Sequence, residues 1–247
     1  MKKLDILIIT ISLFMVGSIF SQDKAPENNP FSLSVDVMSR YIWRGADFGN
    51  SPSIQPNVEY NKGNLTIGAW GAYATNSNYQ EADLYLSYAL SDRVSLTLTD
   101  YFFPSSTPTD NYFDYDHATT GHIFEMSMTI DATEKFPLNF LLATNFYGDD
   151  ADKLLANGTT NGIQYSTYAE VGYNFKNANA FIGFNLSKPN KTRGESGFYG
   201  DSLGVVNLGI TVVKKIKISN SFAIPFSGSL IANPEAEKIF MVIGFSL

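Results

Sequence analysis

Charged residues occupy alternate positions in several otherwise apolar runs of this chain, where a β-strand would place them on one face. The positive ones are Arg40 and Arg44, and the negative ones are Asp36, Glu59, Glu81, Asp83, Glu125 and Glu170. Because an unpaired charge is costly in a dry interior, such groups either line water or pair with one another. In a wet channel, opposed arginines and carboxylates would set a transverse electric field, and the excess of carboxylates would favour cations.

Large aromatic side chains share this polar face. They would narrow a channel or stack on a sugar-like solute, or they would simply fill the interior. The alternative to a channel is therefore a plug of salt-bridged side chains that braces the fold, since small barrels are often filled by side chains. The residues that we expect to line the interior are Arg40, Arg44, Glu59, Asp83, Glu125, Glu170, Trp70 and Tyr168, with Tyr85, Tyr101 and Tyr147 on the same face. If the interior is wet, neutralising Glu125 and Glu170 should shift its ion selectivity.

The elements that must hold these side chains are strands, because apolar and polar residues alternate along most of the chain. The expected strands cover residues 31–44, 53–60, 65–73, 81–90, 94–99, 124–130, 138–147, 165–175, 180–187, 206–212, 222–230 and 239–247. Pro56 and Pro225 cannot donate in a ladder, and Asp100 interrupts an apolar face, so ten or fourteen strands are also compatible with the pattern.

The segments between these strands alternate between two kinds. Mostly tight turns span residues 61–64, 91–93, 132–136, 176–179 and 213–221, and generally longer loops span 45–52, 75–79, 104–121, 148–162, 188–201 and 232–238. Short turns at one end and long loops at the other are typical of outer-membrane barrels. The sequence thus predicts an all-β, transmembrane, up-and-down antiparallel barrel of about twelve strands, with both termini at the short-turn, periplasmic end.

Alternation alone does not say which face points outward. A soluble barrel of the lipocalin type would turn its apolar face inward, whereas a membrane barrel turns it toward lipid. The mid-strand charges on the polar face favour the membrane barrel, and so do aromatic residues near the ends of the apolar faces, where interfacial girdles lie. The girdle residues expected are Tyr41, Trp43, Tyr60, Tyr73, Tyr88, Phe102, Phe146, Tyr173 and Phe175.

The two ends of the chain point to export. Residues 1–21 combine Lys2 and Lys3 with an apolar run and small residues, as in a cleaved secretory signal peptide, although a membrane anchor is the alternative. Residues 22–30 form a polar lead and residues 31–247 the barrel. The last strand keeps one apolar face up to Leu247 and resembles the C-terminal signal read by the barrel-insertion machinery of Gram-negative bacteria. We expect the cell outer membrane as the location and its lipid bilayer as a partner.

Charge and composition exclude other classes. The net charge is −7, and removal of residues 1–21, with two lysines and one aspartate, makes it −8, which is unsuited to nucleic acid. Cysteine is absent, so no disulfide staples an exported fold. No motif for a cofactor is present.

One stretch resembles a known family. Residues 39–45 read Ser39-Arg40-Tyr41-Ile42-Trp43-Arg44-Gly45, and Gln55 follows on the second strand. This opening resembles that of the TorF-type porin family. Weaker similarities lie at residues 122–125, 168–173 and 233–235. The resemblance implies an outer-membrane barrel and carries over no catalytic residue.

Two other chemistries have less support in the sequence. A barrel hydrolase would need His122 within hydrogen-bond reach of an inward serine such as Ser127, and no nucleophile motif stands near either histidine. Acidic residues near 110–116 and 149–152 could hold calcium, but their spacing is not that of a calcium loop, and solvated acidic loops are the simpler interpretation. The sequence therefore favours a porin-like channel for small polar or ionic solutes, and the competing class is a non-conducting barrel with a structural or loop-binding role.

Overall fold

The computed structural model describes residues 29–104, 111–220 and 222–247. The predicted signal peptide and most of the polar lead lie outside these residues. The strands are β1 (Phe31–Met38), β2 (Tyr41–Trp43), β3 (Ala46–Phe48), β4 (Ser53–Lys62), β5 (Leu65–Ala74), β6 (Gln80–Ala89), β7 (Val94–Phe102), β8 (His122–Ile130), β9 (Leu138–Gly148), β10 (Asp152–Leu154), β11 (Thr160–Ile163), β12 (Thr167–Asn174), β13 (Ala178–Asn185), β14 (Gly204–Lys217), β15 (Ala223–Asn233) and β16 (Lys238–Ser246). One 3-10 turn, η1 (Lys191–Arg193), lies between β13 and β14.

Twelve of the described strands close into one barrel, in the order β1-β16-β15-β14-β13-β12-β9-β8-β7-β6-β5-β4. Every neighbouring pair is antiparallel, and the first strand meets the last through the register Val37 to Phe245. Backbone hydrogen bonds between Val35 and Leu247 extend this closure to the final residue. The predicted all-β, up-and-down antiparallel barrel of about twelve strands is confirmed. Among the described residues, no helix is long and apolar enough to cross a membrane.

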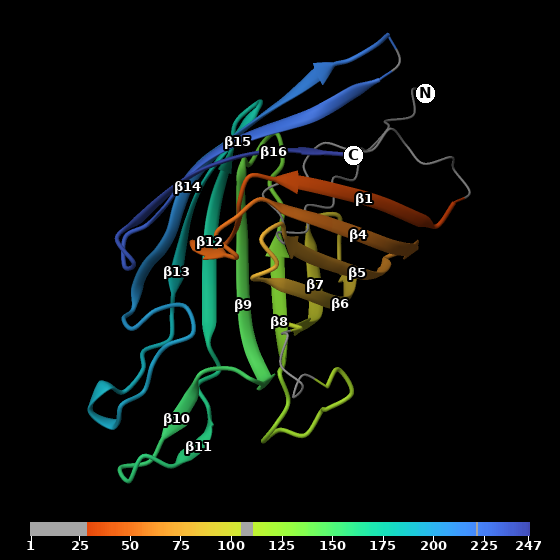
Figure 1. Ribbon diagram of the computed structural model, residues 1–247. Coiled ribbons are helices and arrows are strands. Elements are labelled where there is room, and N and C mark those ends of the chain that lie inside the picture. The colour runs from red at the N-terminus through yellow and green to blue at the C-terminus, as the bar shows by residue number, and fades with distance from the viewer. Residues whose placement is uncertain (1–28, 105–110, 221) are drawn as a thin grey trace.

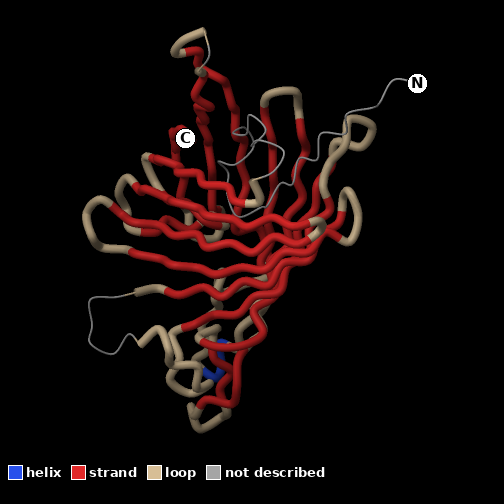
Figure 2. The backbone as a smooth tube through the Cα atoms, turned by 90° about the vertical axis from the view of Figure 1, so that its right-hand side faces the viewer, coloured by secondary structure: helices blue, strands red, loops and turns tan. Residues whose placement is uncertain are grey.

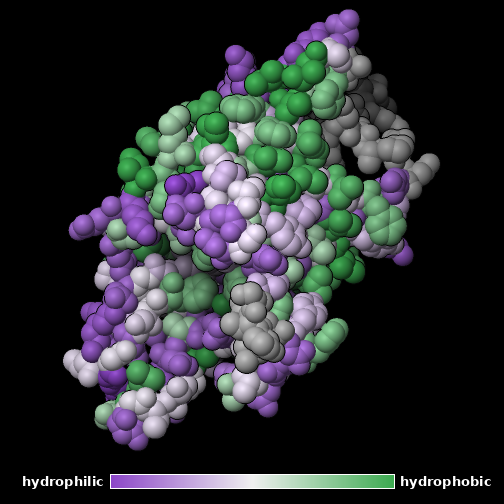
Figure 3. Space-filling view, viewed as in Figure 1, coloured by the Kyte–Doolittle hydropathy of each residue, from purple (hydrophilic) through white to green (hydrophobic). Residues whose placement is uncertain are grey.

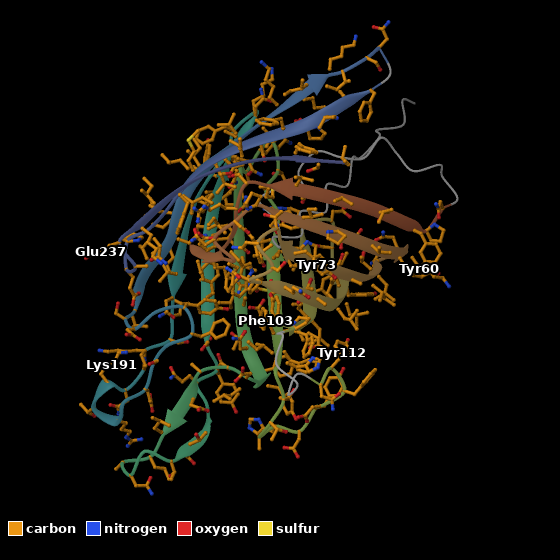
Figure 4. The ribbon with its side chains drawn as sticks, viewed as in Figure 1. Tyr60, Tyr73, Phe103, Tyr112, Lys191 and Glu237 are labelled. Atoms are coloured by element: carbon orange, nitrogen blue, oxygen red, sulfur yellow. The ribbon has the colours of Figure 1, made fainter. Side chains whose placement is uncertain are left out.

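The two ends of the barrel differ as the sequence predicts. The C-terminus and the start of β1 lie with the short turns, while β10, β11 and the other long loops extend from the opposite end (Figures 1 and 2). In Figure 4, Tyr60 lies at the short-turn end, and Lys191 and Glu237 lie at the long-loop end.

The side chains sort by face. Outward positions carry apolar residues that the described part of the chain leaves exposed, such as Leu33 and Met241, which are 72% and 78% exposed. Inward positions carry polar residues that the barrel buries, among them Ser53, Thr99 and Asn145. In Figure 3, hydrophobic surface gathers over the strands and hydrophilic surface over the long loops. This distribution is the reverse of a soluble protein's, whose apolar side chains are mostly inside.

Three expectations about local structure were wrong. Residues 31–44 are not one strand, because the chain bends at Ser39 and Arg40 and then forms a separate two-stranded sheet of β2 and β3. Tyr41 and Trp43 belong to this sheet and not to an outer girdle. Residues 213–221 are not a tight turn, since β14 continues to Lys217. The two faces of the strand still alternate along residues 213–217, but closely spaced lysines replace apolar residues there and obscure the pattern.

A bulge explains a further difference. The register between β8 and β9 shifts between Phe124 and Glu125, so that one extra residue of β9 stands opposite β8. A bulge of this kind puts two successive side chains on one face. Tyr147, predicted inward, therefore joins Phe146 outside, where its hydroxyl donates to the carbonyl of Tyr115.

Phe102 faces outward as expected, yet it is buried under Tyr112.

Candidate functional site

The candidate site is the barrel lumen together with the β2–β3 hairpin that enters it. Trp43 of β2 pairs with Ala46 of β3 across a two-residue turn made by Arg44 and Gly45. Both turn residues have positive φ, 48° and 82°, which is the geometry of the tightest hairpin turns. Gly45 suits this conformation because it has no Cβ. The local sequence thus folds back on itself directly after β1.

Aromatic rings hold one side of the hairpin against the wall. The ring of Tyr41 lies 5.4 Å from that of Trp70 on β5, and the ring of Trp43 lies 5.6 Å from that of Tyr101 on β7. Phe48 packs 5.0 Å from Tyr79, which precedes β6. These centroid distances are those of favourable aromatic pairs. The hairpin is therefore packed on the β5–β7 part of the wall.

Arg44, at the tip, reaches the opposite wall. Its Nη2 donates to Oε1 of Glu125 on β8 at 2.9 Å, and its Nη1 donates to Oε2 of the same carboxylate and to the hydroxyl of Tyr199. The guanidinium also lies 4.7 Å from the ring of Tyr168 on β12 and 4.5 Å from that of Trp43. The side chains of Arg44 and Glu125 are 8% and 0% exposed. Such burial is tolerable only because the charges are paired and hydrogen-bonded.

Further contacts join the hairpin to the remaining wall. The carbonyl of Gly45 accepts a hydrogen bond from Nδ2 of Asn233 on β15 at 3.2 Å. A Cβ on Gly45 would lie 2.0 Å from the carbonyl oxygen of Val206 on β14. Ile42 packs against a cluster that contains Met38, Phe181, Ile231 and Val242. The hairpin thus spans the lumen and constricts it at this level.

The other inward carboxylates are each held by polar neighbours. Tyr85 donates to Glu59 at 2.8 Å, and Ser32 donates to it at 3.2 Å. Tyr168 donates to Glu170, which also accepts from Asn207 at 3.0 Å. The hydroxyl of Tyr79 donates to Glu81 at 2.7 Å, the backbone N–H of Phe102 donates to Asp83 at 3.4 Å, and Ser246 is a hydrogen-bond partner of Asp36.

The charge balance of this region is acidic. Arg44 forms its ion pair with Glu125. Arg40 lies at the base of the hairpin, where it pairs with Asp47 and contacts Asn50. The side chain of Arg40 is 38% exposed, so it is not brought into the group around Glu125. Among the described ion pairs, none involves the carboxylates of Asp36, Glu59, Glu81, Asp83 or Glu170.

Several residues of the site were not predicted from the sequence. Tyr199, from the loop between β13 and β14, donates to Glu125 and packs 5.9 Å from Trp43, and Phe198 packs beside both rings. Tyr79 lies in a segment that the sequence predicts to be a loop, not part of the lumen. No local periodicity marks these positions, because they come from loops folded back over the hairpin.

The constellation required for a hydrolase is not formed by His122 and Ser127. His122 faces outward, with Nδ1 2.6 Å from Oδ1 of Asp100 and Nε2 2.7 Å from the carbonyl oxygen of Tyr112. Its ring stacks on Tyr115 at 4.5 Å. Ser127 lies inward on β8, on the other side of the wall. The outward Asp100, which interrupted an apolar face, is explained by this pairing.

Acidic loop residues accept hydrogen bonds from backbone and side-chain amides. Asp150 accepts from Nδ2 of Asn145 and from the N–H of Ser166. Glu195 accepts from the N–H groups of Leu154 and Asn190 and so ties two long loops together. Within the part of the chain that the structure describes, no group of three or more His, Cys, Asp or Glu side chains is arranged to hold a metal ion.

Residues 23–186 match a family described as "Bacterial protein of unknown function (Gcw_chp)". The chain belongs to this family. Membership of Gcw_chp assigns no activity, and the narrower resemblance to TorF-type porins stays a prediction. No curated protein matches the chain.

Similar solved structures include the KdgM porin, at 10% identity over 86% of this chain and 97% of that one, with a TM-score of 0.45. The NanC porin matches at 11% identity over 87% and 98%, with a TM-score of 0.46. BamA from Haemophilus ducreyi lacking POTRA domains 1-3 matches at 14% identity over 82% and 41%, with a TM-score of 0.41. These likenesses are distant, and the fold of the Gcw_chp chain is defined by its own strand pairing.

Proposed function

We propose that this chain is an outer-membrane channel of the porin type, through which small polar or ionic solutes diffuse, with a preference for cations. One observation carries the proposal: the barrel is apolar outside and polar and acidic inside. An uncovered apolar wall requires lipid, and a closed barrel satisfies every backbone hydrogen bond within it. The interior carboxylates outnumber the arginines near them, which favours cations in a wet lumen.

The proposal also covers how the protein reaches the outer membrane and how it is oriented there. Residues 1–21 act as the signal peptide, and the short-turn end faces the periplasm. The strand β16, whose outward face runs from Ile239 to Phe245, presents the signal for the barrel-insertion machinery together with Leu247, which follows it. Lining roles are assigned to Glu59 and Glu170, with Asp83, Trp70 and Tyr168. Arg40 lies near the entrance, and Arg44 and Glu125 form the constriction.

The hairpin sets the width of this channel. It crosses the lumen and is anchored by rings at its base and by Arg44 at its tip. On its short-turn side, Ser95, Thr97 and Thr129 are small and polar. The channel is therefore narrowest where the hairpin crosses it, and we expect conduction through it to be small.

The test is single-channel conductance of the refolded chain in planar bilayers under a salt gradient. We expect a small, steady conductance with a reversal potential that indicates cation preference. Replacing residues 41–48 by a Gly-Ser linker should raise the conductance several-fold. Glu59→Gln with Glu170→Gln should reduce cation preference, whereas Glu134→Gln, in an exposed turn outside the lumen, should leave it unchanged. Equal reversal potentials in all variants would contradict the proposed role of the carboxylates.

A second candidate has its own support. The contacts of the hairpin with β5, β7, β8, β14 and β15 are what a permanent plug would make. In that case the chain is a non-conducting barrel with a structural or loop-binding role. A silent parent protein and a conducting linker variant would favour this candidate over the channel.

A further inference from the structure

The hairpin of β14 and β15 projects beyond the barrel at the short-turn end. Val212 is the last β14 residue in register with β13, and Phe226 is the first β15 residue in register with β16. Beyond them, residues 215–217 and 223–225 lie in register only with each other, from Lys215 opposite Pro225 to Lys217 opposite Ala223. Figure 1 shows this two-stranded ribbon extending past its neighbours toward the upper right.

The ribbon is basic. Lys214, Lys215 and Lys217 are all exposed, and within the described residues no ion pair joins them to a carboxylate. The same end of the barrel carries other basic residues in its turns and strand ends: Lys62, Arg93, Lys135 and Lys176. The acidic residues of these turns are Asp92, Asp131 and Glu134, so positive charge is in excess at this rim.

Apolar side chains accompany the lysines. Ile216, Ile218 and Phe222 of the ribbon are exposed, and Phe175 and Tyr173 form an exposed ring pair at the neighbouring turn. Lysines beside exposed rings and aliphatic residues suit the boundary between acyl chains and headgroups, where the stem lies along apolar surface and the ammonium reaches the phosphate.

We infer that this rim, and chiefly the β14–β15 ribbon, binds the headgroups of anionic phospholipids in the leaflet on the short-turn side. The inference rests on the membrane location proposed above. A lysine close to an anionic membrane surface is attracted to it, and several lysines at one depth act together. Most charged residues of the long loops at the other end are acidic, including Asp114, Asp116 and Asp149. The attraction to anionic headgroups is therefore confined to the leaflet on the short-turn side.

A simpler role for the ribbon lysines is to prevent another strand from pairing with its two open edges. That role accounts for Lys214, Lys215 and Lys217. It does not account for Lys62, Lys135 and Lys176, which lie at short turns between paired strands. The rim as a whole therefore fits a headgroup surface better than it fits edge protection alone.

The experiment measures lipid selectivity by electron paramagnetic resonance of the full-length mature protein in phosphatidylcholine bilayers. Spin-labelled phosphatidylglycerol and spin-labelled phosphatidylcholine are compared for the fraction of lipid immobilised at the barrel. The ribbon variant is K214Q/K215Q/K217Q. The matched control is K153Q/K188Q/K238Q, which makes the same charge change at exposed positions of the long-loop end.

We expect the parent protein and the control to prefer phosphatidylglycerol, with an association ratio at least about threefold higher than in the ribbon variant at low salt, and we expect high salt to reduce the difference. Equal ratios in all three proteins, or an equal loss in the control, would overturn the inference. Association of the ribbon variant into dimers, seen by light scattering, with unchanged lipid preference would assign the lysines to edge protection instead. Failure of the parent protein to enter any bilayer would overturn the proposed location itself, whereas insertion without lipid preference would overturn this inference alone.

Discussion

The guanidinium of Arg44 and the carboxylate of Glu125, 81 positions apart in sequence, form a bidentate ion pair across the barrel lumen. The pair fastens the tip of an inward hairpin to the opposite wall. Opposed arginines and carboxylates in the lumen were predicted from their positions on one strand face. Arg44 and Glu125 neutralise each other and narrow the lumen. The carboxylates left to act on a permeant ion are therefore those of Glu59, Glu170 and their neighbours.

Breaking this pair should destabilise the barrel. Arg44→Met leaves Glu125 buried without its partner, and loss of one member of a buried pair costs about 3–5 kcal/mol of unfolding free energy. Arg40→Gln is the control, because the half-exposed pair of Arg40 with Asp47 contributes roughly 0–1 kcal/mol. The measurement is urea unfolding of the refolded protein. Similar costs for both substitutions would mean that the lumen around Arg44 is wet enough to screen its charge.

The turn of the hairpin gives a second prediction. Gly45→Ala places a Cβ 2.0 Å from the carbonyl oxygen of Val206 at a φ of +82°, so the tip must move away from the wall. Gly63→Ala is the matched control, since Gly63 also has positive φ, +60°, but nothing lies within 4 Å of the added Cβ. The control should cost about 1 kcal/mol from backbone strain alone, and Gly45→Ala should cost clearly more.

Tryptophan fluorescence checks this prediction directly. The chain has 2 tryptophans, Trp43 in the hairpin and Trp70 on the wall that the hairpin contacts. Displacement of the tip in Gly45→Ala should therefore shift the emission of the folded protein to longer wavelength, while Gly63→Ala should leave it unchanged. An unshifted spectrum in Gly45→Ala would show that the hairpin docks without the close approach at Gly45.

The barrel could be predicted from sequence because strand alternation is a local signal. Leu33, Val35 and Val37 share a face whatever lies around them, and the alternating turn lengths then fix the topology. Pro56 did not change the number of strands, because β4 pairs with β1 and with β5 both before and after this residue. The same alternation of side chains across a strand predicts that four carboxylates face inward: Glu59, Asp83, Glu125 and Glu170.

The site was less predictable because it depends on features that carry no period. The segment from Ser39 to Arg44 reads as a continuation of β1, but the chain bends at Ser39 and Arg40 and leaves the wall. Positive φ at Arg44 and Gly45 then turns it back on itself inside the lumen. A single extra residue in β9 moved Tyr147 to the outer face. Tyr199 reaches Glu125 from a loop, and only tertiary contacts bring the two together.

The outward pair of His122 and Asp100 leads to a third prediction. Nδ1 of His122 lies 2.6 Å from Oδ1 of Asp100 on an otherwise apolar wall, under Tyr112 and Tyr115. His122→Leu removes this partner and should destabilise the fold by about 2–4 kcal/mol, because a carboxylate then remains in apolar surroundings. The double variant His122→Leu with Asp100→Leu should recover most of the loss.

A double-mutant cycle on unfolding free energies measures this coupling. Its control is His117→Leu, since His117 packs on the ring of Tyr147 and, among the described residues, forms no ion pair with a carboxylate. Additive costs for His122→Leu and Asp100→Leu would contradict the coupling and would mean that water reaches Asp100.

Acid should loosen the two long loops that Glu195 joins. Hydrogen bonds from the N–H groups of Asn190 and Leu154 hold the pKa of Glu195 below its usual value of 4.5. Since the folded pKa is depressed, the stabilisation of the loops is fully present above 4.5 and is lost as the pH falls through the lower, folded value. In micelles, the NMR amide signals of Leu154 and Asn190 should therefore titrate with a midpoint below 4.5.

The variant Glu195→Gln should remove this titration, while Asp150→Asn should not. A midpoint at or above 4.5 would show that Glu195 does not accept these hydrogen bonds in solution.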